Sequence, residues 1–167
     1  MKRFLFGIGL LLGVSCFCDF ALVTDGKPAA TIVFSEDNPT VCAQLGALEL
    51  QHHVKQITGA ELPIAKAGEK ADTPNSIVIG GDAKGMVGDA SAIEFSGNTL
   101  RLYGNDTSRR EAVDYSKQST FPKLADECKG TLFAVYDFLE LYCGVRFFGI
   151  REFDTYCPQS SSLSVKE

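Results

Sequence analysis

The segment that decides the fold of this chain is residues 129–149, which read KGTLFAVYDFLELYCGVRFFG. At about 100° per residue, a helix through this segment carries apolar side chains on two sides and leaves only Asp137 and Glu140 as a polar edge. Gly144 can end the helix, and residues 145–148 then read as a strand. A helix that covers only one face of a sheet needs a single apolar stripe, so the second apolar side predicts a second neighbour.

The two apolar sides of this helix have different predicted roles. The larger side consists of Leu132, Val135, Leu139, Tyr142 and Cys143, with Tyr136 at its margin. The second side consists of Ala134, Phe138 and Leu141. We expect this second side to be an interface with a neighbour outside the chain.

The residues before this segment predict a sheet and one further helix. Residues 20–23 and 30–34 are β-rich and are joined by the turn sequence at 25–28, which predicts a hairpin or tight connection. Asn38 is the expected N-cap of a helix that has Pro39 at its first position and ends at Thr58 and Gly59. One apolar stripe runs along it, made of Ala43, Ala47, Leu50, Val54 and Ile57.

Further strands are predicted in the middle of the chain. Residues 76–80 read as a buried strand, and residues 93–95 and 100–103 alternate around a turn at 96–99, which predicts a hairpin. Residues 104–129 are long and polar and match no regular element. The sequence therefore predicts a small α/β layer of the α+β type, a mixed or antiparallel sheet with two main helices packed on one face.

Composition limits the class of protein. The chain has 167 residues, of which 45% are hydrophobic and 22% charged, as expected of one globular domain. Its net charge of -5 and its scattered Lys and Arg residues provide no basic surface for a phosphate backbone, so nucleic acid is excluded as a partner.

The N-terminus predicts export. Residues 1–18 begin with a basic pair, continue with a short apolar run and end with small residues, which is the layout of a secretory signal. We expect cleavage after Cys18 and a domain over residues 19–167 in a secreted or periplasmic protein. Lipid attachment at Cys16 is the alternative.

Export bears on the four remaining cysteines, Cys42, Cys128, Cys143 and Cys157. An oxidising compartment permits disulfides, but Cys128 and Cys143 flank the quoted helix and would be roughly 20 Å apart. Two pairings stay open: Cys42 with Cys128 and Cys143 with Cys157, or Cys42 with Cys143 and Cys128 with Cys157. Free thiols are an equal alternative. A zinc site is disfavoured because no two of these cysteines have Cys-x-x-Cys spacing.

The candidates for catalysis or metal binding are weak. Asp137 and Glu140 lie side by side on one helix face instead of facing each other across a cleft, so we interpret them as a solvated edge. Glu49 with His52 and His53 forms no metal-binding motif, and we interpret this group as a solvent-facing patch. Residues 79–85 are glycine-rich but have the spacing of neither phosphate-binding motif, so they predict a strand-ending turn. We expect no catalytic residue, metal or cofactor in this chain.

Several blocks resemble a known family in their order along the chain. They are residues 22–33 (LVTDGKPAATIV), 47–51 (ALELQ), 57–64 (ITGAELPI), 77–80 (IVIG), 130–140 (GTLFAVYDFLE) and 144–148 (GVRFF). Together they resemble the N-terminal domain of α-glucuronidase-like glycoside hydrolases, which is similar in fold to the second domain of β-N-acetylhexosaminidases. The resemblance implies an accessory domain without catalytic residues that precedes a catalytic (β/α)₈ barrel, and residues 150–167 resemble the linker towards that barrel.

The resemblance leads to three functional hypotheses. The first is a non-catalytic accessory domain of a secreted glycoside hydrolase, which packs against a catalytic barrel or a partner chain. The second is a carbohydrate-binding module, which would have to use Tyr103, Tyr115 and Phe121 because the chain has no Trp. The third is a glycosidase that acts through Asp137, Glu140 or acidic residues of the long segment 104–129.

Overall fold

A five-stranded mixed sheet forms the centre of the molecule. In the computed structural model, which describes residues 19–123, 125–149 and 154–166, the strand order is β4-β3-β5-β7-β6. The strands are β3 (Ala30–Phe34), β4 (Ile64–Ala65), β5 (Asn75–Ile79), β6 (Ser91–Ser96) and β7 (Thr99–Gly104). β4, β3, β5 and β7 are parallel, and β6 forms the predicted antiparallel hairpin with β7. The predicted mixed α/β character is confirmed.

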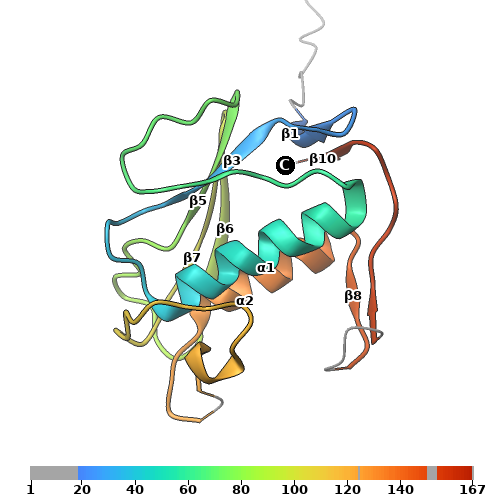
Figure 1. Cartoon of the computed structure of the whole chain (residues 1–167). Coiled ribbons are helices and arrows are strands. Elements are labelled where there is room, and N and C mark those ends of the chain that lie inside the picture. Colours follow the sequence, from blue (N-terminus) through green and yellow to red (C-terminus); the bar gives the residue numbers. More distant parts are fainter. Residues whose placement is uncertain (1–18, 124, 150–153, 167) are drawn as a thin grey trace, which may run out of the picture.

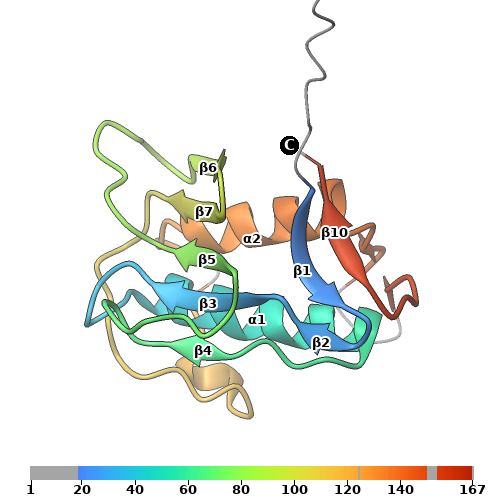
Figure 2. The ribbon, with the colours of Figure 1, turned by 90° about the horizontal axis from the view of Figure 1, so that it is seen from above.

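Two helices lie side by side on one face of this sheet, α1 (Val41–Thr58) and α2 (Gly130–Leu141) (Figures 1 and 2). α1 begins after Thr40, whose hydroxyl accepts a hydrogen bond from the Ala43 amide at 3.1 Å. The predicted cap at Asn38 is therefore wrong by two residues, because it is the Thr40 side chain that satisfies an open amide of the first turn. The predicted end is confirmed: Gly59 follows the helix in the left-handed region, with φ of +77°.

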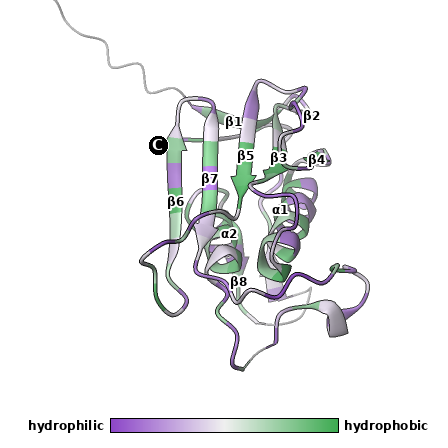
Figure 3. Cartoon of the chain, turned by 90° about the vertical axis from the view of Figure 1, so that its left-hand side faces the viewer, coloured by the Kyte–Doolittle hydropathy of each residue, from purple (hydrophilic) through white to green (hydrophobic). Residues whose placement is uncertain are grey.

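The core lies between the helices and the sheet. The predicted stripe of α1 is buried throughout, namely Ala43, Ala47, Leu50, Val54 and Ile57. The facing strands supply Ile32, Ile77, Ile79, Leu100 and Leu102, all fully buried. Burial of each such large apolar side chain stabilises the fold by about 1.5–3 kcal/mol. Figure 3 shows the hydrophobic residues concentrated in the strands and on the facing sides of the helices, while the loops are mainly hydrophilic.

α2 has both of its neighbours within the chain. On one side Val135 packs against α1 at Gly46, where an added Cβ would lie 3.1 Å from the Val135 Cγ2 atom. On the other side, towards β6 and β7, Ala134 and Phe138 are fully buried. The predicted interface of Ala134, Phe138 and Leu141 is therefore wrong for its first two residues, because the sheet already covers them. Leu141 stays 74% exposed.

The remaining strands form two small sheets. One has the order β10-β1-β2, from β1 (Phe20–Thr24), β2 (Lys27–Pro28) and β10 (Leu163–Val165). The other pairs β8 (Arg146–Phe147) with β9 (Thr155–Tyr156). Asp25 and Gly26 both have positive φ, as a two-residue hairpin turn between β1 and β2 requires. Of the two predicted alternatives for residues 20–34, the hairpin of residues 20–23 with 30–34 does not occur, because β3 belongs to the central sheet, whereas the turn at Asp25 and Gly26 does.

Two predictions concern the ends of the chain. The expected signal at residues 1–18, with Cys16, lies outside the described residues. Of the segment that resembles a linker, the described residues 154–166 fold back onto the domain, where Leu163 and Val165 are buried. Neither helix of the described part has the length and apolarity needed to cross a membrane.

Candidate binding cleft at the strand ends

A cleft of about 490 Å³ opens where the parallel strands β3, β5 and β7 end. It is lined by residues 35–36 after β3, residues 80–84 after β5 and residues 104–106 at the end of β7, together with Thr40, Ser108 and Arg110. In open α/β sheets, ligands bind in the crevice outside the carboxyl ends of the strands. This position makes the cleft the candidate functional site.

The turn after β5 forms one wall of the cleft and depends on two glycines. Gly80 has φ of +80°, and an added Cβ would lie 3.2 Å from Ser35 Oγ and 3.3 Å from Ala43 Cβ. Gly81 has φ of +128°. Because only glycine adopts such backbone conformations readily, these two residues bring the turn against the end of β3. The glycine-rich segment is thus the strand-ending turn that the sequence predicts, and it borders the cleft.

Asp106 lies at the inner side of the cleft and joins the first turns of both helices. Its Oδ2 atom accepts a hydrogen bond from the Thr40 hydroxyl at 2.6 Å, and its Oδ1 atom accepts one from the Thr131 amide at 2.8 Å. Thr40 caps α1, and Thr131 is the second residue of α2. Burial raises the pKa of the Asp106 carboxyl, and these hydrogen bonds oppose that rise by stabilising its charged form.

Charges of both signs line the cleft. Arg110 pairs with Glu36 at 2.8 Å and also donates to the carbonyl of Asn38. Asp82 accepts a hydrogen bond from the Lys84 amide through Oδ1 at 2.9 Å. The lining thus contains three carboxylates, those of Glu36, Asp82 and Asp106, and two cations, those of Lys84 and Arg110. Within the described residues, no group of three or more His, Cys, Asp or Glu side chains has the arrangement of a metal site.

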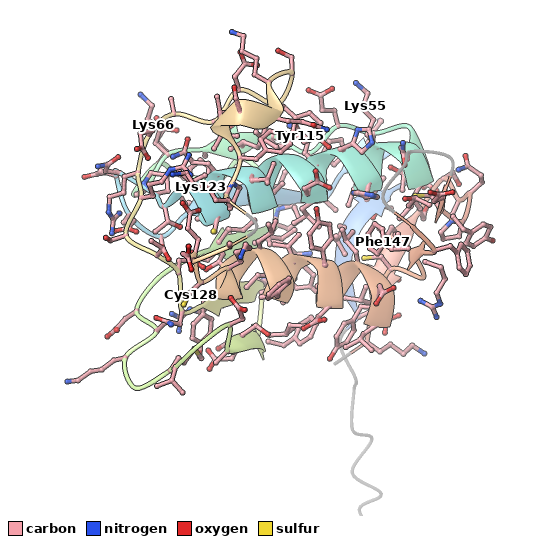
Figure 4. All side chains as sticks on the ribbon, turned by 90° about the horizontal axis from the view of Figure 1, so that it is seen from below. Lys55, Lys66, Tyr115, Lys123, Cys128 and Phe147 are labelled. Carbon is pink, nitrogen blue, oxygen red and sulfur yellow. The ribbon has the colours of Figure 1, made fainter. Side chains whose placement is uncertain are left out.

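The group of Glu49 and His53 is not the solvent-facing patch that the sequence predicts. His53 is only 5% exposed, and its Nδ1 atom lies 2.8 Å from the Glu49 carbonyl oxygen and 3.6 Å from Glu49 Oε2. The long loop covers this helix face with Tyr115, whose hydroxyl donates to Glu49 Oε1 at 3.0 Å. Phe147 packs edge-on against His53, with ring centroids 5.3 Å apart. Figure 4 shows Tyr115 beside α1 and Phe147 near the C-terminal ends of the helices.

Burial changes the ionisation of this group. It lowers the pKa of His53, because the charged imidazolium loses hydration, while the Glu49 carbonyl and carboxylate oppose this effect. Tyr136 on α2 also has a raised pKa, caused first by burial and then by the nearby Glu49 carboxylate. We interpret the group as a packed polar contact between α1, α2 and the loop.

The other predicted catalytic pair lies at the surface. Asp137 is exposed, and its Oδ2 atom lies 3.4 Å from the Ser91 hydroxyl of β6. Glu140 is half-buried on the same helix, and its carbonyl oxygen accepts a hydrogen bond from Arg146 at 2.6 Å. Neither residue lines the cleft.

The four described cysteines are free thiols at two ends of the helix pair. The Cys42 thiol donates to the Cys128 carbonyl at 3.7 Å, next to the first turns of both helices. Cys143 is buried at the C-terminal end of α2, and Cys157 packs against the core cluster that contains it. The fold thus brings Cys42 close to Cys128, as in the first predicted pairing, but without a bond between them.

Large exposed apolar side chains gather beyond the C-terminal end of α2. Leu141, Phe148 and Tyr156 are 74%, 78% and 56% exposed. Arg146 lies opposite Tyr156 in the β8–β9 pair, and its guanidinium reaches the Glu140 carbonyl beside Leu141. Side chains alternate along a strand, so Phe148, which directly follows β8, points to the same side as Arg146. Phe147 points to the opposite side, where it packs against His53 and Tyr136. We name Leu141, Phe148 and Tyr156 the terminal apolar patch.

The three aromatic residues considered for sugar stacking do not form one platform. Tyr103 lies on the open face of the sheet, where Arg101 covers its ring at 4.9 Å. Tyr115 and Phe121 belong to the loop beside α1, with ring centroids 6.1 Å apart. The predicted aromatic set is therefore divided between two faces of the molecule.

Sequence reasoning missed the contribution of Asp106 and Arg110 to the cleft. Both belong to the long segment without periodicity, so no pattern singled them out as ligand-facing residues. The available signal was position: Asp106 comes two residues after the end of β7, and the carboxyl ends of parallel strands meet at one edge of a sheet.

Comparisons with known proteins supply no family for this chain: no protein-family model and no curated protein matches it.

Proposed function

We propose that this chain is the non-catalytic accessory domain of a secreted, α-glucuronidase-like glycoside hydrolase, and that it packs against a catalytic (β/α)₈ barrel. Two arguments support the proposal. The first is the ordered resemblance of six sequence blocks, the most specific of which are residues 130–140 and 144–148. The second is the terminal apolar patch, in which Leu141 directly follows the first of these blocks and Phe148 ends the second.

The terminal apolar patch is the observation that carries the proposal. Exposed apolar residues that occur singly are ordinary, whereas a contiguous group rimmed by polar side chains marks an interaction surface. Arg146 lies opposite Tyr156 in the β8–β9 pair, and its guanidinium donates to the carbonyls of Glu140 and Val145, so that a fixed charge accompanies the apolar side chains. Aromatic residues and Arg are enriched where protein interfaces obtain most of their energy.

The placement of the patch suits a neighbouring domain. It lies beyond the C-terminal end of α2, away from the cleft at the strand ends (Figure 1). An accessory domain that docked through the patch would leave the cleft open. Full burial of Leu141 or Phe148 would contribute about 1.5–3 kcal/mol for each side chain.

The test uses residues 19–167 and the isolated catalytic barrel of an α-glucuronidase-type hydrolase. We expect the wild-type chain to bind a dye for apolar surfaces and to bind the barrel in a titration calorimeter. Leu141→Lys and Tyr156→Lys should weaken both signals. The matched control is Val87→Lys, because Val87 is 80% exposed but lies in the loop after β5. Equal binding by the patch variants and the control would contradict the docking surface.

A glycosidase assay tests the non-catalytic part of the proposal. We expect no turnover of aryl glycosides by the purified chain. Turnover that disappears in Asp137→Asn or Glu140→Gln would replace this proposal with that of an enzyme.

A further inference from the structure

We infer that the cleft at the strand ends binds a small neutral polyol, the chemical class to which one sugar unit belongs. The inference depends on the lining of the cleft and not on the docking of a barrel. The two sites lie at opposite ends of the helix pair, so each can be tested without the other.

The chemical character of the lining excludes an apolar ligand. Ala83 is the only apolar side chain among the lining residues, and the other positions are glycines or polar and charged residues. The volume of about 490 Å³ lies within the range of roughly 300–1,000 Å³ that is typical of small-molecule sites. A compact, strongly hydrogen-bonding molecule fits such a lining.

The charges disfavour an anion. Lys84 and Arg110 are the cations of the cleft, but the Glu36 carboxylate occupies the guanidinium of Arg110. Asp82 and Asp106 add two further negative charges. Because Glu36 and Arg110 offset each other, a phosphate or a uronate would meet the two carboxylates of Asp82 and Asp106 and the single cation of Lys84, with a net repulsion that a neutral ligand avoids.

Hydroxyl groups match the remaining donors and acceptors. Among the described residues, Asp82 accepts a hydrogen bond through Oδ1 only, which leaves Oδ2 available to a ligand. Lys84 lies two residues away, and no ion pair engages its ammonium group in the described part of the chain. A carboxylate accepts hydrogen bonds and an ammonium donates them, so this pair can bind two adjacent hydroxyls. The Ser35 hydroxyl at the end of β3 can do both.

The wall that carries these groups is well positioned for a ligand. The turn begins directly after β5, whose residues pair on both sides with β3 and β7. Gly80 lets the turn pack closely against Ser35 and Ala43, which fixes the position of the residues that follow it. Polar groups held on the end of a central strand require little reorganisation when a ligand binds.

The experiment is a titration of ¹⁵N-labelled residues 19–167, monitored through amide chemical shifts. The probes are glucose, xylose, glucuronate and inorganic phosphate, each up to about 100 mM, a range that covers weak single-site binding. We expect glucose or xylose to shift the amides of residues 80–84 and 104–106 in a saturable manner. Asp82→Ala should raise the Kd at least about tenfold, as the loss of a hydrogen bond to a charged group does.

The matched control is Asp72→Ala, which removes an exposed carboxylate from the loop before β5 and should leave the Kd unchanged. Leu141→Lys should also leave it unchanged, which separates this inference from the docking proposal. Three results would overturn the inference: no saturable shift around the cleft with either neutral sugar, saturation by glucuronate or phosphate alone, or an unchanged Kd in Asp82→Ala.

Discussion

Asp106 provides the sharpest test of how this fold is held together. One carboxylate accepts a hydrogen bond from the cap residue of α1 and another from the first turn of α2. The two helices come from distant parts of the sequence and begin at the same edge of the sheet. Substitution of Asp106 should therefore weaken the anchoring of both helices at once.

The expected magnitude follows from those two contacts. Asp106→Ala leaves the Thr40 hydroxyl and the Thr131 amide without this acceptor, and a hydrogen bond to a charged group contributes about 1.5–3 kcal/mol. Part of this loss is offset because the carboxylate no longer has to be buried. We expect a decrease of roughly 2–4 kcal/mol in the free energy of unfolding, or roughly 5–15 °C in Tm for a domain of this size.

Asp106→Asn is the matched variant. An amide oxygen can accept from the Thr131 amide, and the amide nitrogen can donate to the Thr40 hydroxyl, so both helices stay connected. We expect a loss of less than about 1 kcal/mol. Urea unfolding of residues 19–167, followed by circular dichroism, measures all three proteins. An Ala variant within about 0.5 kcal/mol of the wild type, or an Asn variant as unstable as Ala, would refute this reasoning.

Three further predictions concern the core, the buried histidine and the thiols. Phe138→Ala should lower the free energy of unfolding by about 3–5 kcal/mol in the same urea assay because it opens a cavity. Phe133 is 39% exposed on the same helix, so Phe133→Ala should lower it by less than about 1 kcal/mol. Burial lowers the pKa of His53 in the folded state, so the stability that the neutral side chain contributes is present above pH 6.5 and is lost as the pH falls from 6.5 through the folded pKa. The free energy of unfolding should therefore differ less between about pH 8 and about pH 5 in His53→Gln than in the wild type. Burial raises the pKa of Cys42 to about 12, so a thiol reagent near pH 8 should modify the half-buried Cys128 first. After unfolding without a reductant, all four thiols of residues 19–167 should react, and fewer reactive thiols would reveal a disulfide.

The elements of the fold were predictable where a local pattern existed. The stripe of α1 from Ala43 to Ile57 faces the core because its spacing follows the helical period. The hairpin of β6 and β7 was predictable from alternation around the turn at residues 96–99. The wide apolar surface of α2 correctly indicated two neighbours. Their identity depended on packing against α1 and the sheet, which the residues of α2 alone do not specify.

The candidate site was less predictable because it is assembled from distant segments. The glycine-rich turn at residues 80–81 was recognised, but the Asp106 carboxylate reaches the first turns of α1 and α2 only after the sheet has formed. For the same reason the environment of Glu49 was predicted wrongly. Its helix face is polar by sequence, and it becomes covered because Tyr115, 66 residues away, closes over it.

The antiparallel pairing of β1 with β10 places Phe20 directly opposite Val165 (Figure 2). The first and last strands of the described part of the chain therefore lie side by side. A unit of this kind can be inserted into a surface loop of another protein without separating the ends of that loop. A short linker from Val165 to Phe20 would likewise allow circular permutation, in which new ends are opened at an exposed turn such as residues 96–99.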